Sequence, residues 1–317
     1  MKRVVSVSLG SSRRDHTVRL ELLGETVEIQ RIGTDGDVRR AVQLIRELDG
    51  QVDAFGMGGT DLYLVAGRRR YVLRAALPMA RAARKTPIVD GSGLKNTLER
   101  RVVRQLAREG VVDFARSRVL VTVAVDRFGM AEALAETGCE LILGDLIFAL
   151  GIPIPLRSLA TLERLARIIA PIAVRLPLSV LYPTGERQEQ IVPKYGRFFA
   201  WADVIAGDWH YIRRHMPPSL GGKVILTNTV TAEDVELLRR RGARMLITTT
   251  PELGGRSFAT NVMEAVLVAL SGRRPDELGP ADYERLLDAV GFRPRIERLD
   301  AAAGAAAARS SGPSPGR

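Results

Sequence analysis

The alternation of apolar strands and helices in residues 87–146 is the feature that most constrains the fold of this 317-residue chain. Residues Arg118 to Ala124 form a β-branched apolar run that is typical of a strand covered on both faces. A helix is expected over Met130 to Thr137, which Gly138 ends, and Glu140 to Gly144 is expected to be the next strand. Strand, helix and strand within about 30 residues make a βαβ unit, whose crossover is nearly always right-handed. This unit predicts a parallel sheet.

The same alternation continues after Asp145, where short apolar strands and amphipathic helices follow one another as far as Leu270. We therefore predict an α/β fold with a doubly wound, mostly parallel, Rossmann-like sheet and a smaller N-terminal α/β domain. The expected segments are 1–86 for the N-terminal mixed α/β domain, 87–272 for the Rossmann-like domain, 273–300 for a C-terminal helix, and 301–317 for a low-complexity, disordered tail.

Composition excludes several classes of protein. The hydrophobic share of 46% suffices for a sizeable core, yet no apolar run approaches the roughly 18–20 residues that a membrane span needs. One cysteine excludes an internal disulfide framework and favours a reducing compartment, and three histidines leave little for a zinc site. We therefore expect a cytoplasmic protein with neither membrane contact nor a metal site.

The formal net charge of +11 raises the question of an acidic partner. The basic residues are scattered in twos and threes, as in Arg239 to Arg241, and no basic stripe is interleaved with aromatic residues. This pattern disfavours nucleic acid and favours an anionic small molecule as the partner. The sequence leaves open whether identical copies associate into a homo-oligomer.

Polar, turn-forming residues follow successive predicted strands. Ligands of open α/β sheets bind outside the carboxyl ends of the strands, so these residues are candidates for ligand contacts. The alternative for any single loop is an ordinary polar turn. The candidates for substrate binding are Thr184, Asp208, His210, Arg213, Asn228, Arg256 and Ser257.

Two of these loops suggest specific chemistry. Residues 254–257 (GGRS) precede a predicted helix and offer backbone N–H groups and a cation to a phosphate or carboxylate. The alternative there is a helix start capped by Ser257. Asp208 and His210 are spaced to form an acid–histidine pair, and the alternative is a half-buried histidine without such a role.

A glycine-rich loop at residues 90–96 (DGSGLKN) is the other dense site. Glycine allows the backbone to approach a ligand closely. Asp90 is placed to relay a proton or hold a hydroxyl, and Lys95 to orient or polarise a carbonyl oxygen. The alternative is a capped loop, with Asn96 and Glu99 facing solvent.

The stretch from Asp90 to Asp145 resembles the middle of the shikimate/quinate 5-dehydrogenase family. That family has a T-D-G-x-G loop, which corresponds here to Val89 and the residues DGSG that follow it. The strand RVLVTVA and the helix MAEALAETG fall where the family's nucleotide-binding fold begins. The resemblance implies that Asp90 is a catalytic and substrate-binding residue. Of the family's G-A-G-G-A turn only Gly129 is in place, and the N-L-T-x-P-x-K segment has no counterpart.

The spacing of two acids suggests the cofactor. Asp145 follows Asp126 at about the 20-residue distance at which a dinucleotide fold places its ribose-binding acid. An acid there favours the ribose 2′-OH of NAD over the phosphate of NADP. The expected NAD contacts are therefore Asp126 and Gly129 at the pyrophosphate, and Asp145 at the ribose.

Three hypotheses follow. The preferred one is an NAD-dependent dehydrogenase of a cyclic hydroxy acid, with Asp90 and Lys95 as catalytic residues. The second is a transferase or lyase acting on a phosphorylated or carboxylated metabolite. The third is a non-catalytic small-ligand sensor.

Overall fold

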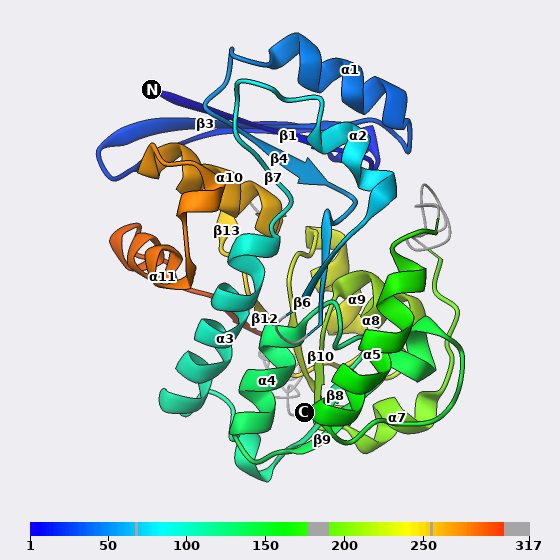
Figure 1. Cartoon of the computed structure of the whole chain (residues 1–317). Coiled ribbons are helices and arrows are strands. Elements are labelled where there is room, and N and C mark those ends of the chain that lie inside the picture. The colour runs from blue at the N-terminus through cyan, green and yellow to red at the C-terminus, as the bar shows by residue number, and fades with distance from the viewer. Residues whose placement is uncertain (67–68, 177–189, 254–255, 301–317) are drawn as a thin grey trace, which may run out of the picture.

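The computed structural model describes residues 1–66, 69–176, 190–253 and 256–300. Figure 1 shows two sheets, each with helices packed on it, and the sheet formed by the N-terminal strands lies above the other. The expected tail, residues 301–317, and the strand expected at residues 178–181 lie outside the described residues. Within the described ranges, no helix is both long and apolar enough to cross a membrane.

The first sheet has the strand order β2-β3-β1-β4-β7. Its strands are β1 (Lys2–Ser8), β2 (His16–Leu22), β3 (Glu25–Gly33), β4 (Ala54–Gly58) and β7 (Ile88–Val89). β1 runs parallel to β3 and β4, β4 runs parallel to β7, and β2 is antiparallel to β3. The carboxyl ends of the four parallel strands therefore meet at one edge.

Helices cover both faces of the first sheet because its strands are apolar on both faces. Val5 and Val7 of β1 share one core with α1 (Val38–Leu48) and α2 (Leu77–Ala80). Val4 shares the other core with α10 (Thr260–Ser271), which comes from far along the chain. Residues 260–269 of α10 are all buried, as expected of a helix enclosed on every side.

The second sheet has the order β15-β12-β11-β10-β8-β9. Its strands are β8 (Arg118–Val121), β9 (Glu140–Leu143), β10 (Val204–Ala206), β11 (Val224–Thr227), β12 (Met245–Thr248) and β15 (Arg295–Arg298). All neighbouring pairs are parallel except β15 with β12. The strand order reverses between β8 and β10, the switch point beside which ligands of such sheets bind.

The second sheet is also covered on both faces. In β8, Val119 and Val121 contribute to one core and Leu120 to the other. The helices around it are α3 (Ser92–Arg108), α4 (Phe128–Glu136), α5 (Leu159–Ala173), α7 (Gly196–Trp201), α8 (Trp209–His215), α9 (Ala232–Arg240) and α11 (Pro280–Ala289). The prediction of an α/β fold with a mostly parallel sheet is confirmed, and the molecule has two such sheets.

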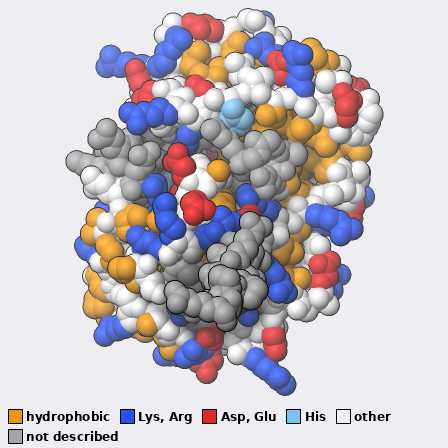
Figure 2. All heavy atoms as spheres, turned by 180° about the vertical axis from the view of Figure 1, so that it is seen from behind, with side chains coloured by type: hydrophobic (Ala, Val, Ile, Leu, Met, Phe, Trp, Pro, Cys, Tyr) orange, Lys and Arg blue, Asp and Glu red, His pale blue; other side chains and the backbone are white. Residues whose placement is uncertain are grey.

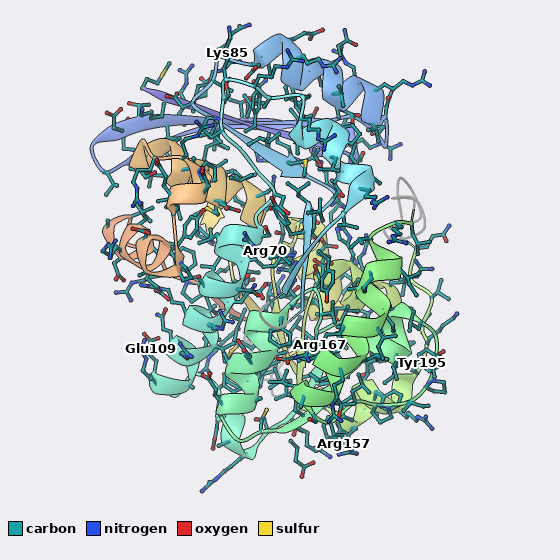
Figure 3. All side chains as sticks on the ribbon, in the orientation of Figure 1. Arg70, Lys85, Glu109, Arg157, Arg167 and Tyr195 are labelled. Carbon is teal, nitrogen blue, oxygen red and sulfur yellow. The ribbon has the colours of Figure 1, made fainter. Side chains whose placement is uncertain are left out.

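A hairpin formed by β5 (Tyr63–Ala66) and β6 (Arg69–Val72) extends from the first sheet toward the second (Figure 1). Arg70 of this hairpin lies between the two sheets in Figure 3. Its guanidinium carbon is 5.0 Å from the centre of the Tyr63 ring. A second short hairpin joins β13 (Glu252–Leu253) and β14 (Arg256–Ser257).

Candidate functional site

The carboxyl ends of the two sheets are joined through one lysine. Lys95, in the first turn of α3, donates from Nζ to Asp61 at 3.3 Å and to Asp126 at 3.0 Å. Asp61 follows β4 of the first sheet and Asp126 follows β8 of the second. The three side chains are only 11–20% exposed, so they form a partly buried cluster that solvent still reaches.

An arginine continues this cluster across the switch point of the second sheet. Arg127, whose side chain is 4% exposed, contacts Glu99 of α3 at 2.6 Å and Asp208, which follows β10, at 2.7 Å. We call Asp61, Lys95, Glu99, Asp126, Arg127 and Asp208 the inter-sheet site. Because β8 and β10 flank the switch point, Arg127 lies where a doubly wound sheet binds its ligand.

Asn228, at the end of β11, extends the inter-sheet site by one more loop. Its Nδ2 donates to Asp208 at 2.9 Å, and its Oδ1 accepts from the backbone N–H of Trp209 at 3.1 Å. The structure thus brings together Lys95, Asp126, Asp208 and Asn228 from the residues that the sequence singled out.

Burial and charge act against each other in the inter-sheet site. Burial alone would lower the pKa of Lys95, but Asp126 and Asp61 outweigh it and raise that pKa. Burial would raise the pKa of Asp126, yet Lys95 and Arg127 hold it well below its usual range. Burial raises the pKa of Asp61. The positive charge of Lys95 opposes this effect, and the negative charges of Asp126 and Asp90 add to it. At neutral pH the lysine therefore stays charged.

Asp90 lies beside the inter-sheet site, where it organises the backbone. Its carboxylate accepts hydrogen bonds from the N–H groups of Leu62 (2.5 Å) and Tyr63 (3.2 Å), and from the N–H (3.0 Å) and hydroxyl (2.7 Å) of Ser92. It thereby fixes the base of the β5–β6 hairpin to the start of α3. These are the contacts of a structural turn, but the predicted solvent-facing position of Glu99 is wrong, because its side chain is 1% exposed.

Asp145 does not lie at a free strand end. It begins a π-helical turn (Asp145–Ala149), and its carboxylate accepts from the backbone N–H groups of Ala124 at 3.1 Å and Val125 at 2.9 Å. Burial raises its pKa to about 6. These N–H groups follow β8, where a dinucleotide fold would present donors to a pyrophosphate. The Asp145 carboxylate already accepts hydrogen bonds from these N–H groups, and Asp126 adds negative charge beside them. The turn therefore does not fit the pyrophosphate of NAD.

Gly129 lies at the crossing of α4 over α3. Its N–H donates to Asn96 Oδ1 at 2.9 Å, and a Cβ added there would come within 2.6 Å of the Asn96 carbonyl oxygen. This glycine therefore allows two helices to pack closely, a role that the cofactor interpretation did not anticipate.

The other candidates are dispersed. Asp208 caps α8 and accepts from the backbone N–H of His210 at 2.9 Å. Arg213 of α8 contacts Asp234 of α9 at 3.5 Å. Thr184 lies outside the described residues, as do the side chains of Arg256 and Ser257. The predicted cap by Ser257 is wrong, because Ser257 belongs to β14 and the next helix starts at Thr260 with Ala259 as its N-cap.

Sequence reasoning missed Asp61, Glu99 and Arg127. Asp61 follows β4 through Gly59 and Thr60, so the strand-end rule would have found it had it been applied to the first sheet. Glu99 and Arg127 meet only in three dimensions, and no local pattern indicates a contact between α3 and the loop after β8.

Glu264 of α10 is a further buried carboxyl that the sequence analysis missed. It is 3% exposed and accepts a hydrogen bond from Tyr283 Oη of α11 at 2.8 Å. Burial and the nearby Asp90 raise its pKa to about 7. The only signal in the sequence is a charged residue within an otherwise apolar helix.

The raised pKa of Glu264 predicts that the stability of the fold depends on pH. Because its folded-state pKa lies above the usual value of 4.5, the folded state holds the proton more tightly, and stability is lost as pH rises from about 4.5 to about 7. Glu264→Gln removes this titration, so the variant should gain up to about 3 kcal/mol relative to the natural chain across that interval. Urea denaturation of both proteins over this pH range measures the difference. A constant difference would contradict the assignment.

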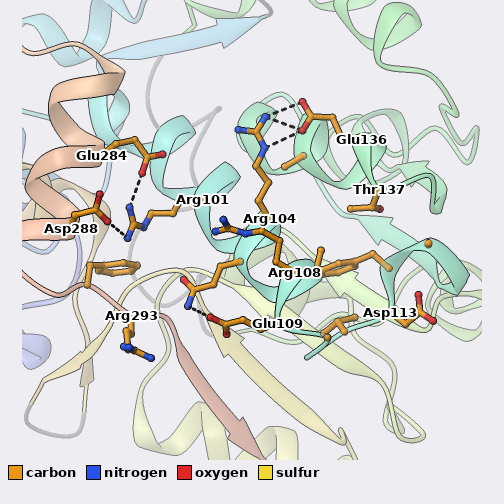
Figure 4. A pocket seen from close by; sticks show the side chains of 18 residues that line it. Arg101, Arg104, Arg108, Glu109, Asp113, Glu136, Thr137, Glu284, Asp288 and Arg293 are labelled. Carbon is orange, nitrogen blue, oxygen red and sulfur yellow. Dashed lines mark hydrogen bonds and ion pairs between the residues drawn. The ribbon is translucent and has the colours of Figure 1, made fainter.

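A separate groove of about 1250 Å³ lies on the outer side of α3, between α4 and α11 (Figure 4). Arginines of α3 bridge it to both neighbours: Arg101 contacts Glu284 at 2.8 Å and Asp288 at 2.6 Å, and Arg104 contacts Glu136 at 2.9 Å. These ion pairs connect α3 to α4 and to α11. Figure 2, which shows the molecule from behind relative to Figure 1, has acidic and basic side chains lying together near the middle of that face.

Two family models match the chain. The one described as "Domain of unknown function (DUF8754)" matches residues 93–299, and "Domain of unknown function (DUF8753)" matches residues 3–90. The search of curated proteins found no significant match.

Solved structures of solute-binding proteins are loosely similar. A galactofuranose binding protein is 12% identical with a TM-score of 0.39, covering 96% of this chain and 97% of that one. The glucose-galactose binding protein GanP from Geobacillus stearothermophilus is 9% identical with a TM-score of 0.36, covering 95% and 98%. The binding component of the arabinose ABC transporter from Shewanella sp. ANA-3 is 11% identical with a TM-score of 0.35, covering 99% and 100%. This likeness is too loose to carry a ligand from them to this chain.

The interpretation as a quinate/shikimate-type dehydrogenase, and as an NAD oxidoreductase, is wrong. The family models that match residues 3–90 and 93–299 are two domains of unknown function and not a dehydrogenase family. The geometry gives the physical reason. Asp90 is held by backbone donors, and Asp145 covers the N–H groups that would meet the pyrophosphate. The resemblance rested on a loop and a βαβ unit that many α/β proteins contain.

Proposed function

The chain belongs to the family described as "Domain of unknown function (DUF8754)", and we propose from its geometry that it binds a small polar molecule between its two sheets without converting it. The observation that carries this proposal is the contact of Lys95 with Asp61 of the first sheet and Asp126 of the second. Loops at the carboxyl ends of parallel strands are where α/β sheets bind ligands, and here the loops of two sheets share one cluster.

Binding agrees better with this cluster than catalysis does. A catalytic base or nucleophilic lysine needs a pKa near the working pH, whereas Asp126 and Asp61 raise the pKa of Lys95 despite its burial. Asp208 is engaged by Arg127, by Asn228 and by the backbone N–H of His210. Side chains fixed in this way present a preorganised set of charges and hydrogen-bonding groups, which suits recognition.

Thermal unfolding with a panel of small polar molecules tests the proposal. The panel contains sugars and amino acids, each scaffold in neutral, amine-bearing and carboxylate-bearing form. A compound present at about 100 times its Kd should stabilise the fold by about 2.7 kcal/mol, which corresponds to a rise in Tm of about 5 °C. For the compound that binds most tightly, Asp126→Asn should reduce this rise to about half, because an affinity weakened about tenfold leaves about 1.4 kcal/mol of stabilisation.

The matched control is Asp113→Asn, which changes an exposed aspartate that follows the end of α3 opposite to Lys95. It should retain the full ligand-induced rise in Tm. The proposal fails when no panel compound stabilises the natural chain, or when both variants respond to the ligand as the natural chain does.

A further inference from the structure

We infer that the inter-sheet site selects a small molecule carrying a protonated amine over its neutral and acidic counterparts. This inference rests on the proposed function and specifies the charge of the ligand. It departs from the expectation of an anionic ligand, which followed from the net charge of the whole chain and not from the charges at the site.

The balance of charge at the site is the first observation. The inter-sheet site contains two cations, Lys95 and Arg127, and both contact Asp126. Its carboxyl groups are Asp61, Glu99, Asp126 and Asp208, each in direct contact with one or both of these cations. Four acids share two cations, so the site carries an excess of negative charge although the chain as a whole is basic.

The second observation is that the cations have little capacity left. Lys95 is divided between Asp61 and Asp126, and Arg127 is divided among Glu99, Asp126 and Asp208. Among the described residues, Glu99 Oε2 and Arg127 Nε are buried without a hydrogen-bond partner, and Arg127 Nε forms an ion-pair contact with Asp126 at 3.2 Å. Burial and neighbouring acids raise the pKa values of Asp61 and Asp145, as expected where negative charge is in excess.

A ligand that brings a cation relieves this imbalance. An ammonium group donates three hydrogen bonds and forms charge-assisted contacts with carboxylates, of which Asp126, Asp61 and Asp208 are 14–20% exposed. A carboxylate or phosphate would add charge of the same sign. In the part of the chain that the structure describes, no group of three or more His, Cys, Asp and Glu side chains is arranged to hold a metal ion. An organic cation therefore suits the site better.

Titration calorimetry with three hexoses that differ at one substituent tests the inference. The probes are D-glucosamine, D-glucose and D-glucuronate, at about pH 7, where an amine of this kind is mostly protonated. D-glucosamine should bind at least about tenfold more tightly than D-glucose, and D-glucuronate should give no measurable heat. The same order should hold for each amine, neutral and acid triplet of the panel that includes a binder.

A matched pair of variants locates the effect. Asp126→Asn should lower the affinity for the amine-bearing probe about tenfold and change the affinity for the neutral probe less than about twofold. Asp113→Asn should change neither. Tighter binding of the neutral or acidic member overturns the charge preference and leaves the proposed function standing. An absence of binding by every panel compound overturns both, and displacement of the amine by Mg²⁺ or Ca²⁺ would show that the site prefers a metal ion.

Discussion

Arg127→Met is expected to destabilise the folded chain by about 3–5 kcal/mol, one of the two largest effects that the structure predicts. Arg127 is almost completely buried and contacts Glu99, whose side chain is 1% exposed, as well as Asp208. Removing the guanidinium leaves a buried carboxylate without its counter-charge, and water cannot readily take its place. Urea denaturation should show a lower midpoint with an unchanged slope.

The control for Arg127 is Arg104→Met, which removes an arginine that is 55% exposed and paired with Glu136. Exposed pairs contribute about 1 kcal/mol or less, so this variant should remain close to the natural chain. The double variant Arg127→Met, Glu99→Met should recover much of the lost stability, because the orphaned charge is removed together with its partner. Equal losses for Arg127→Met and Arg104→Met would contradict the role assigned to burial.

Gly129→Ala is the other substitution with a large expected effect, a loss of about 3 kcal/mol. The added Cβ would come within 2.6–3.0 Å of the carbonyl oxygen, Cα and carbonyl carbon of Asn96. These are backbone atoms in the interior of α3, so α4 has to move away from α3 to make room. That movement also displaces Arg127, the N-cap of α4, from the inter-sheet site.

Gly196→Ala is the matched control for Gly129→Ala. Gly196 is the first residue of α7, and an added Cβ would meet no atom within 4 Å. Alanine has the higher helix propensity, so this variant should be neutral or slightly more stable. Thermal and urea denaturation of the two variants side by side separates the steric effect from a general effect of replacing glycine. A Gly129→Ala protein as stable as the Gly196→Ala protein would show that the crossing is looser than the structure indicates.

The sequence predicted the parts of the fold that depend on local pattern. The apolar run at residues 118–124 contains β8, buried on both faces, and the helix expected over Met130 to Thr137 overlaps α4, Phe128–Glu136. Asp126, Asp208 and Asn228 each follow a parallel strand, where ligand-binding residues are expected. In the structure, contacts through Arg127 and Asp208 link the three.

The roles of the acids could not be predicted, because they depend on which donors the fold brings near. The carboxylate of an aspartate that follows a strand can accept a hydrogen bond equally well from a ligand hydroxyl or from a backbone N–H group. Asp145 accepts hydrogen bonds from the backbone N–H groups of Ala124 and Val125. Asp90 accepts them from the N–H groups of Leu62, Tyr63 and Ser92. The partners of Asp90 include residues nearly 30 positions earlier, so no local spacing reveals them.

The position of α10 has a consequence for how such a chain can arise and be divided. The two family models meet between residues 90 and 93, as if two modules had been joined there. Yet α10, within the later segment, covers Val4 and Ile29 of the first sheet, and its Asn261 donates to Ser6 of β1 at 2.9 Å. The earlier segment therefore lacks one side of its own core. Inheritance, recombination and proteolysis should treat the two segments as a single unit, because neither contains all the apolar surface that its fold must bury.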